Sequence, residues 1–405
     1  MKSFLEDLRY ALRLLYRNLG FTIVAVLTLA LAIGATSTIF SAVSAVLLRD
    51  LPYPDPGRLA VLWGEDRARD LHRGQICYPD LQDWRAQSSA IESAAAFSGY
   101  WQPVLVGASG AEQLDGVRVS TDFFHVLKTS PMLGRDFLPE EEMTGVNVTI
   151  LSHGLWARRF GSDPNIVGRK VAISGSPYTV IGVLPPQFQA LPSRLLEHSA
   201  EIYRPLGKEF SDEIRGGRHL RAIARLKPGI TLAQAQAQLN TISQRMEAAN
   251  PATNRGRGVR AVGLHDDMVQ EIRPALLVLQ ACVLMIVLIA CANVANLVLA
   301  RSSGRRREIA IRQAMGAARS RLVRQMLTES LALAVMGGAG GILVAFWCLP
   351  VLEELGAKTI PELARLAIDW RVAGFAAALS MITGIVFGMV PAMELSAISP
   401  VGALR

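Results

Sequence analysis

Charged residues are missing from four stretches of the chain, which contain no Asp, Glu, Lys or Arg: 18–48, 274–300, 330–352 and 372–393. A helix needs about 20 apolar residues to cross the hydrocarbon core of a bilayer, and each stretch is long enough. This absence excludes a chain that is soluble throughout. It predicts a multi-pass α-helical membrane protein with four transmembrane helices. A large α+β extracytoplasmic domain is expected between the first helix and the second.

Cysteine and histidine are also scarce, with four and six residues, respectively. Cys282, Cys291 and Cys348 lie in the expected spans, which leaves Cys77 unpaired in the long intervening segment. This distribution excludes a disulfide framework. The histidines form neither an H-x-x-x-H pair nor a cluster with cysteine, so no metal site is expected.

A phosphate-binding loop of the form G-x-x-x-x-G-K-[ST] is absent from these 405 residues. The acidic groups Asp266–Asp267 and Glu140–Glu142 are interpreted as solvated loop residues. Ser152 and His153 are neighbours in the sequence, which is no evidence for a nucleophile and its base. We therefore expect no catalytic residues and no cofactor on this chain, and a membrane-anchored enzyme is the weakest functional hypothesis.

The basic residues are distributed asymmetrically. If both termini and the segment 301–329 face the cytoplasm, these parts hold 13 basic and five acidic residues, a difference equal to the whole net charge of +8. Cytoplasmic segments of membrane proteins are enriched in Lys and Arg. This predicts cytoplasmic termini and an extracytoplasmic large domain. It argues against nucleic acid as a partner, although the pI of about 9.6 alone would permit one.

These patterns predict the following order. Residues 1–20 form a cytoplasmic interfacial amphipathic helix, 21–48 form the first transmembrane helix and a stalk, and 49–271 form the extracytoplasmic domain. The second transmembrane helix is expected over 272–300, a cytoplasmic loop over 301–329 and the third transmembrane helix over 330–352. A short extracytoplasmic loop follows over 353–371, then the fourth transmembrane helix over 372–393 and a cytoplasmic tail over 394–405.

Two helices and several strands are predicted in the extracytoplasmic domain. The helices are expected over 80–97 and over 232–249, where Thr231 is a suitable N-cap. Strands are expected at 146–151, 170–173, 178–184 and 220–226, between Gly, Pro, Asn and Ser turn residues. The arrangement predicts two α/β lobes that flank a β-rich insert at roughly 146–214.

Small and amide residues mark expected packing surfaces of the transmembrane helices. Small residues spaced by four allow helices to approach closely in lipid, and whether these face the same chain or another subunit is left open. Asn293 and Asn296 share one helix face and are expected to hydrogen-bond to a neighbouring helix rather than to contact substrate. The residues assigned to helix packing are Gly34, Asn293, Asn296, Gly337, Gly341, Gly384 and Gly388.

The basic loop over 301–329 has two interpretations from its composition. Two short helices separated near Gly316 would suit docking onto a soluble protein, with Ile309 and Met315 in an apolar pocket and Glu308 and Arg312 at its rim. The same charge would also suit binding to anionic membrane lipid. The residues alone do not decide between them.

A family resemblance favours docking. The segments 293–296, 305–312, 315–317 and 329–330 together closely resemble the coupling segment of FtsX-domain permeases of the MacB type, which belong to ABC transporters. The segment 118–137 and the ending 399–405 also resemble this family. The resemblance covers nearly the whole chain.

The resemblance implies four transmembrane helices and a periplasmic domain with porter-like and β-rich sabre-like lobes. It also implies a bacterial inner-membrane dimer with a separate cytoplasmic ATPase, which carries the ATP, and a periplasmic adaptor is left open. The ATPase-docking residues that it implies are Glu308, Ile309, Arg312, Met315, Gly316 and Ala317.

The segment 78–85, Tyr-Pro-Asp-Leu-Gln-Asp-Trp-Arg, resembles a sub-branch of duplicated orphan permeases that carry two copies of this unit. This chain contains one copy, so a natural half-length unit and a truncated one both stay open, as do a homodimer and a heterodimer.

The expected function is that of a permease subunit for export or efflux, which transmits ATP-driven motion to the periplasmic domain. The alternative is a regulator that transports nothing and couples the ATPase to an effector such as a cell-wall hydrolase. Cargo, transport direction and the identity of the ATPase are not determined by the sequence.

Overall fold

The computed structural model describes residues 9, 11, 13–49, 51–107, 110–188, 191, 193–196, 200–211, 215–303, 319–356 and 368–396. The chain divides into two compact units. One, here called the helical unit, comprises Met1–Arg49 and Glu271–Arg405, and the other, the sheet unit, comprises Asp50–Gln270. Each unit is described separately below.

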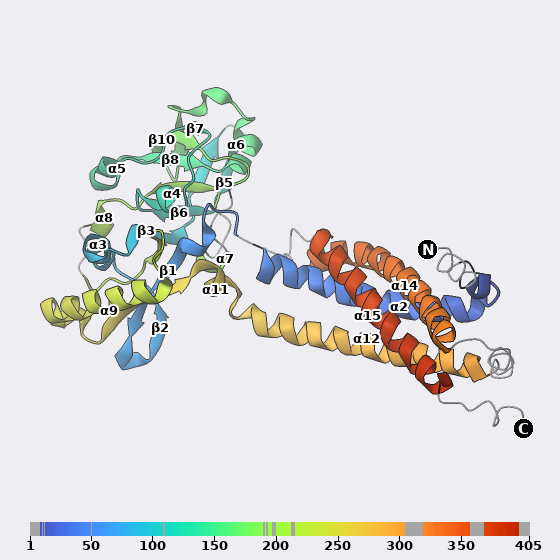
Figure 1. Ribbon diagram of the computed structural model, residues 1–405. Coiled ribbons are helices and arrows are strands. Elements are labelled where there is room, and N and C mark those ends of the chain that lie inside the picture. Colours follow the sequence, from blue (N-terminus) through green and yellow to red (C-terminus); the bar gives the residue numbers. More distant parts are fainter. Residues whose placement is uncertain are drawn as a thin grey trace, which may run out of the picture. The chain divides into compact units, whose positions relative to one another are not determined.

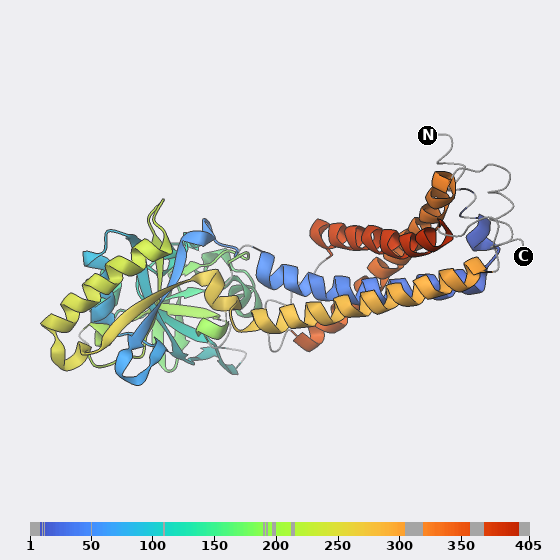
Figure 2. The same cartoon turned by 60° about the horizontal axis from the view of Figure 1, so that its bottom comes forward.

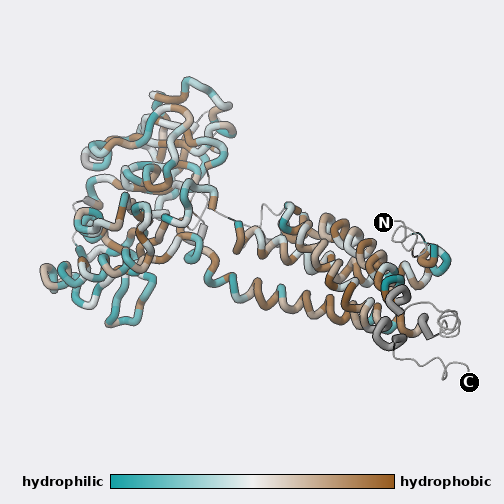
Figure 3. The backbone as a smooth tube through the Cα atoms, viewed as in Figure 1, coloured by the Kyte–Doolittle hydropathy of each residue, from teal (hydrophilic) through white to brown (hydrophobic). Residues whose placement is uncertain are grey.

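Four long helices make up most of the described helical unit (Figure 1). They are α2 (Leu19–Val43), α12 (Ile272–Ser303), α14 (Arg319–Gly356) and α15 (Trp370–Ser396), and α2 continues into a π-helical segment, η1 (Ser44–Leu48). Each contains a segment long and apolar enough to cross a membrane, and apolar residues cover them along most of their length (Figure 3). The predicted four-helix membrane protein with a large intervening domain is confirmed.

The helix ends differ from the predicted spans because charge marks the edge of the membrane rather than the end of a helix. α14 begins at Arg319, well before the uncharged stretch at 330–352, and its apolar span covers Val323–Leu352. Of the predicted amphipathic helix over 1–20, the structure describes residues 9, 11 and 13–20, and all of these except 17 and 18 are helical.

Glycines on α14 bring it close to α2. A β-carbon on Gly337 would lie 2.6 Å from Cβ of Leu29, and one on Gly341 would lie 2.9 Å from Cγ2 of Ile33. On the α2 side, a β-carbon on Gly34 would lie 2.7 Å from Cβ of Val344. These separations are shorter than van der Waals contact, so each position accommodates only glycine without movement of a helix.

Glycines also bring α14 and α15 close together. A β-carbon on Gly384 would lie 2.8 Å from Cβ of Ala334, and one on Gly388 would lie 2.9 Å from Cβ of Ser330. On the α14 side, Gly338 faces the hydroxyl of Ser380. The expected packing glycines therefore lie against helices of their own chain.

The sheet unit is built on one mixed sheet that contains 13 strands among the described residues, in the order β13-β1-β12-β3-β6-β11-β8-β10-β9-β4-β5, with β2 paired to β1 and β7 to β10. The strands are β1 (Leu59–Asp66), β2 (Leu71–Gly74), β3 (Ile91–Trp101), β4 (Val104–Gly107), β5 (Gly110–Gln113), β6 (Gly116–Val119), β7 (Leu133–Gly134), β8 (Val148–Leu151), β9 (Lys170–Ile173), β10 (Ser176–Val183), β11 (Ile202–Pro205), β12 (Arg221–Leu226) and β13 (Arg257–Gly263).

Short helices lie between these strands. They are α3 (Tyr78–Gln87), α4 (Phe123–Val126), α5 (Pro139–Thr144), α6 (His153–Phe160), α7 (Ser193–Leu196), α8 (Lys208–Ser211), α9 (Leu232–Ala249), α10 (Pro251–Asn254) and α11 (Leu264–Val269). Three 3₁₀ turns, η2 (Pro56–Arg58), η3 (Arg67–Arg69) and η4 (Pro164–Ile166), complete the described elements of this unit.

Strands from different parts of the sequence share the sheet. The hairpin β4–β5 precedes the expected β-rich insert at 146–214, yet it pairs with β9 and extends the same sheet. The pairs β6–β11 and β8–β10 are parallel, whereas the other strand pairs are antiparallel. The β-rich half of the sheet is therefore assembled from non-contiguous segments, which local sequence patterns do not reveal.

The side chains of the central strand β3 point alternately into two apolar cores. Ala95 and Phe97 belong to a core with the aromatic residues of α4, whereas Ala94 and Ala96 belong to a second core with Leu81 of α3 and other side chains of α3 and α9. All four are fully buried. Side chains alternate between the two faces of a strand, so one strand supplies both cores.

The predicted helix over 80–97 is wrong in its second half. The helix α3 ends at Gln87, and residues 91–101 form β3. Alanine favours a helix locally, but in the sheet the run Ala94–Ala96 is covered on both faces. Small side chains fit where two layers of structure press on one strand, so tertiary packing overrides the local preference.

The predicted helix over 232–249 is confirmed at both ends as α9. The hydroxyl of Thr231 accepts a hydrogen bond from the backbone N–H of Gln234, and the side chain of Gln234 in turn accepts one from the backbone N–H of Thr231. This capping box satisfies donors that a helix start leaves open. Leu239 and Met246, on one face of this helix, are buried.

Replacement of Gly384 by leucine is expected to separate α14 from α15 and to lower the stability of the helical unit, because the first added carbon already collides with Ala334. Gly374→Leu on the same helix is a matched control, since no atom lies within 4 Å of a β-carbon there. The detergent-solubilised proteins would be compared by thermal unfolding. Equal midpoints for the two variants would show that this contact does not stabilise the fold.

Candidate functional site

The predicted docking residues lie outside the described part of the chain. These are Glu308, Ile309, Arg312, Met315, Gly316 and Ala317, all within 304–318. The described helices on either side end at Ser303 and begin at Arg319. The loop 357–367 and the tail 397–405 also lie outside the described residues. The assignment of the docking site therefore stays a prediction from the sequence.

The expected interhelical hydrogen bonds of Asn293 and Asn296 are not present among the described residues. Both side chains are exposed on α12, whereas Cys291 and Val294 on the same helix are buried. The three-residue spacing does place the two amides on one face, as expected, but this face points away from the other described helices. The described helices of this chain supply no partner, so the expected hydrogen bond to a neighbouring helix stays a prediction that would require a helix of another subunit.

Polar contacts between the described spans involve hydroxyl groups and backbone carbonyls. The hydroxyl of Thr36 on α2 lies 2.8 Å from the carbonyl oxygen of Ala32 and 3.2 Å from that of Val283 on α12. On α15 the hydroxyl of Ser380 donates to the carbonyl oxygen of Ala376 at 2.7 Å. These hydroxyl groups donate their hydrogen bonds to backbone carbonyl oxygens, and they provide no charged path through the unit.

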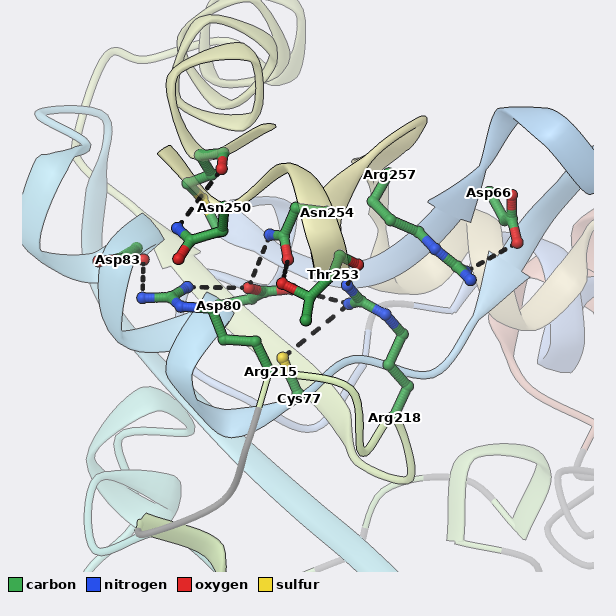
Figure 4. Close-up of polar contacts among 11 residues, drawn as sticks. Asp66, Cys77, Asp80, Asp83, Arg215, Arg218, Asn250, Thr253, Asn254 and Arg257 are labelled. Atoms are coloured by element: carbon green, nitrogen blue, oxygen red, sulfur yellow. Dashed lines mark hydrogen bonds and ion pairs between the residues drawn. The ribbon is translucent and has the colours of Figure 1, made fainter. Parts of the chain in front are cut away.

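A buried cluster of charges surrounds Asp80 in the sheet unit (Figure 4). The Asp80 carboxylate, with 2% of its side chain exposed, lies 3.0 Å from Nη1 of Arg215 and 2.7 Å from Nη1 of Arg218. It also accepts a hydrogen bond from Nδ2 of Asn254 at 3.0 Å. Arg215 lies 2.6 Å from Asp83 as well.

Local sequence positions these groups. The helix α3 begins at Tyr78, and Pro79 and Asp80 stand in its first turn, where proline is tolerated and a negative charge is favoured by the helix dipole. Arg218 also donates to the carbonyl oxygen of Thr253 at 3.3 Å. The cluster therefore ties α3 to α10 and to the segment before β12.

Both oxygens of Asp80 have cationic or amide partners, so the cluster has the properties of a structural clamp. Burial raises the pKa of the neighbouring Cys77 thiol to about 12, which keeps the thiol protonated at neutral pH. Among the described residues no group of three or more His, Cys, Asp or Glu side chains suits a metal ion. The cluster therefore offers neither a nucleophile nor a metal centre.

From the sequence, the segment 78–85 was interpreted only as a family motif, and this clamp was not predicted. A signal was available: Asp80 and Asp83 are three residues apart, as are Arg215 and Arg218. This spacing allows the two aspartates, as a pair, to contact the two arginines. The pairing between segments 135 residues apart is decided only by the fold.

The acidic residues expected to be solvated are partly buried and paired. Asp267, 1% exposed, accepts a hydrogen bond from Nε1 of Trp63 at 2.8 Å and lies 2.6 Å from Arg73. Glu141 pairs with Arg135 at 2.6 Å. The expectation of solvated side chains holds for Asp266 and Glu140, which are exposed. It was wrong for Asp267, Glu141 and Glu142, which are buried.

Ser152 acts as a helix cap in the structure. Its hydroxyl accepts a hydrogen bond from the backbone N–H of Leu155 at the start of α6. The ring of His153 packs edge-on against Trp156, with centroids 5.5 Å apart. Both side chains thus have structural contacts of their own, in keeping with the interpretation that they are no catalytic pair.

Replacement of Asp80 by asparagine is expected to loosen α3 and α10, because Arg215 and Arg218 lose their shared charge partner. Removal of one member of a buried ion pair costs roughly 3–5 kcal/mol, and partial exposure of the two arginines places the expected loss near the lower end. Hydrogen exchange of full-length protein would show faster exchange in both helices. Asp70→Asn, at a side chain 95% exposed, is the control, and equal protection in both variants would contradict a clamp.

Two family profiles match the chain. The profile described as a MacB-like periplasmic core domain matches residues 22–242. The profile described as an FtsX-like permease C-terminal domain matches residues 281–400. The first covers α2 and most of the sheet unit, and the second covers most of α12 and all of α14 and α15.

Curated relatives carry related descriptions. The macrolide export ATP-binding/permease protein MacB of Salmonella paratyphi A is 25% identical over 99% of this chain and 61% of its own length. MacB of Bdellovibrio bacteriovorus is 24% identical over 82% and 50%, respectively. The pyoverdine export ATP-binding/permease protein PvdT of Pseudomonas syringae pv. tomato is 26% identical over 67% and 40%. The chain therefore spans about half the length of the curated relatives that it matches.

Among solved structures, the periplasmic region of MacB from Actinobacillus actinomycetemcomitans is 15% identical, with a TM-score of 0.40 over 58% of this chain and 97% of that one. The family itself is established by the sequence profiles, which together cover both units. The chain belongs to the ABC permeases of the MacB/FtsX type, with a MacB-like periplasmic core domain and an FtsX-like permease domain.

Proposed function

We propose that this protein is the permease subunit of an ABC-type export or efflux system, driven by a separate cytoplasmic ATPase that binds the ATP. Family membership supports a permease, and the relatives named above are described as exporters of macrolides and pyoverdine. The loop that begins after Ser303 is the proposed contact with the ATPase. Both termini are proposed to face the cytoplasm.

The observation that carries this proposal is the way the helical unit packs. The uncharged spans contact one another through glycines at separations too short for any other residue. Tight packing of this kind resists deformation, so motion of the docking loop would pass along α14 to α2 and α15 as displacement of whole helices. This favours transmission of mechanical work to the periplasmic domain over passage of a polar solute between the spans.

The combined variant Arg312→Glu and Met315→Asp is expected to abolish recovery of the ATPase. It reverses the charge at the rim of the proposed contact and places a charge in its apolar centre. The test is an affinity pull-down of full-length protein in mild detergent, with mass spectrometry of ATP-binding proteins. Arg17→Glu, an exposed basic residue near the start of the first span, controls for loss of cytoplasmic charge.

Two outcomes would contradict this assignment. Equal recovery of the ATPase by wild type and the combined variant would place docking elsewhere. Loss of binding to anionic vesicles in the combined variant without any loss of ATPase would favour the lipid-binding interpretation of the loop. The regulator alternative shares the docking step and would be separated by export assays in proteoliposomes that contain both subunits.

We further propose that the exposed amides of α12 meet a second permease copy. An amide side chain that faces lipid leaves its donors and acceptors unsatisfied, and hydrogen bonds across helices relieve this cost. Asn293 and Asn296 lie on an exposed face whose neighbours include Ile289 and Leu297. A homodimer would bring this face against itself.

The variant Asn293→Leu with Asn296→Leu is expected to shift the protein from dimer towards monomer, since cross-helix amide bonds contribute about 1 kcal/mol each. Mass photometry of nanodisc-embedded protein would measure the distribution. Trp347→Leu on α14, a side chain 74% exposed, serves as the control for a change on an exposed surface. An unchanged dimer fraction in the amide variant would exclude this face as the interface.

A further inference from the structure

Two arginines stand side by side on the sheet of the periplasmic domain. Arg118 on β6 and Arg204 on β11 are directly opposite each other in a parallel strand pair. Residues opposite each other on neighbouring strands share one face of a sheet. Their guanidinium groups therefore repel each other unless enough negative charge lies nearby.

The acidic partner described for this arginine pair, Arg118 and Arg204, is distant from both guanidinium groups. Nη2 of Arg204 lies 3.6 Å from the carboxylate of Glu209, and Nη1 of Arg118 lies 3.8 Å from the same oxygen. These separations exceed the length of a hydrogen bond. Nη1 of Arg204 and the hydroxyl of Tyr178 are 2.8 Å apart, and neither Nε has a partner among the described residues.

A comparison within the same domain shows how unusual this is. In the clamp, Asp80 approaches two guanidinium groups at 2.7 and 3.0 Å and has lost nearly all exposure. In the arginine pair the shared carboxylate of Glu209 is 58% exposed and forms no hydrogen bond to either group. The clamp has the geometry of a finished structural contact, whereas the arginine pair keeps donors available.

The surroundings would also favour an anion. Burial lowers the pKa of Arg118, and repulsion by Arg204 adds to this effect. The guanidinium carbon of Arg204 lies 5.1 Å from the centroid of the Trp101 ring, and that of Arg118 lies 5.7 Å from the centroid of Phe210. Aromatic faces hold guanidinium groups flat and in place. The two side chains stay 26% and 20% exposed, so a ligand can reach them.

We propose that Arg118 and Arg204 form a binding site for the carboxylate of an anionic ligand with an aromatic or aliphatic body. Two adjacent guanidinium forks match the two oxygens of a carboxylate. Trp101, which is partly exposed, would contact the apolar body, whereas Phe210 is buried and holds Arg118 in place. The carboxylate of Glu209 interacts only weakly with the two arginines, and a ligand carboxylate displaces it. This explains the long distances from Glu209 to both guanidinium groups and the exposure of its side chain.

The inference does not depend on the ATPase or on dimer formation, because every residue in it belongs to the periplasmic domain of one chain. It places the recognition of an acidic group on β6 and β11, at the middle of the strand order of the sheet. Because the carboxylate of Glu209 competes with a ligand for the same arginines, the direction of its effect can be predicted. Removal of its charge must strengthen binding of a competing carboxylate.

The test uses full-length protein in nanodiscs of zwitterionic lipid, with phenylacetate as the probe and phenylacetamide as its neutral counterpart. Binding is measured by saturation-transfer NMR and titration calorimetry. Wild type is expected to bind phenylacetate and not phenylacetamide. Arg204→Gln is expected to weaken binding about tenfold or more, since a hydrogen bond to a charged group contributes about 1.5–3 kcal/mol.

Glu209→Gln is expected to tighten binding of phenylacetate about threefold or more, and it changes an exposed side chain that the fold does not need. Arg169→Gln, at an arginine 59% exposed and 3.9 Å from its acidic partner, is the control and is expected to leave the affinity unchanged. Three results would overturn the proposal: equal binding of the amide, an affinity that Glu209→Gln fails to raise, or an equal loss in the control.

Discussion

The close approach of α2, α14 and α15 is the contact on which the helical unit depends. In lipid the burial of apolar side chains provides little drive for association, since hydrocarbon surrounds the helices anyway. What remains is dispersion between closely fitted surfaces, and this requires small residues. Gly337 and Gly341 on α14 supply that surface towards α2, and Gly384 on α15 supplies it towards α14. A bundle held in this way moves as a body, which is the property that the proposed function requires.

The periplasmic domain uses charge in two different ways. Around Asp80 each oxygen is matched at short distance, and the cluster joins segments that are far apart in the chain. The arginine pair instead has too little negative charge for its positive charge. Satisfied groups maintain the fold, whereas unsatisfied ones are available to a ligand.

Local patterns predicted elements well where local forces dominate. Thr231 was predicted as the N-cap of α9, and this helix begins and ends at the predicted residues. The helix over 80–97 was only half right, since the alanines of β3 take their conformation from the two layers that cover them. The amide pair Asn293 and Asn296 was placed on one face correctly, but whether that face meets a helix of the same chain depends on the arrangement of all four helices.

The sequence by itself determined the four spans, the large intervening domain and the family, because absent charge and short motifs act through local chemistry and need no fold to be recognised. Only the tertiary structure decided which glycines meet which helix, that Asp80 meets Arg215 and Arg218, and that Arg118 stands beside Arg204. These contacts depend on strand register and helix packing, which join residues that no local pattern connects. A one-residue change of register would turn the arginines to opposite faces of the sheet.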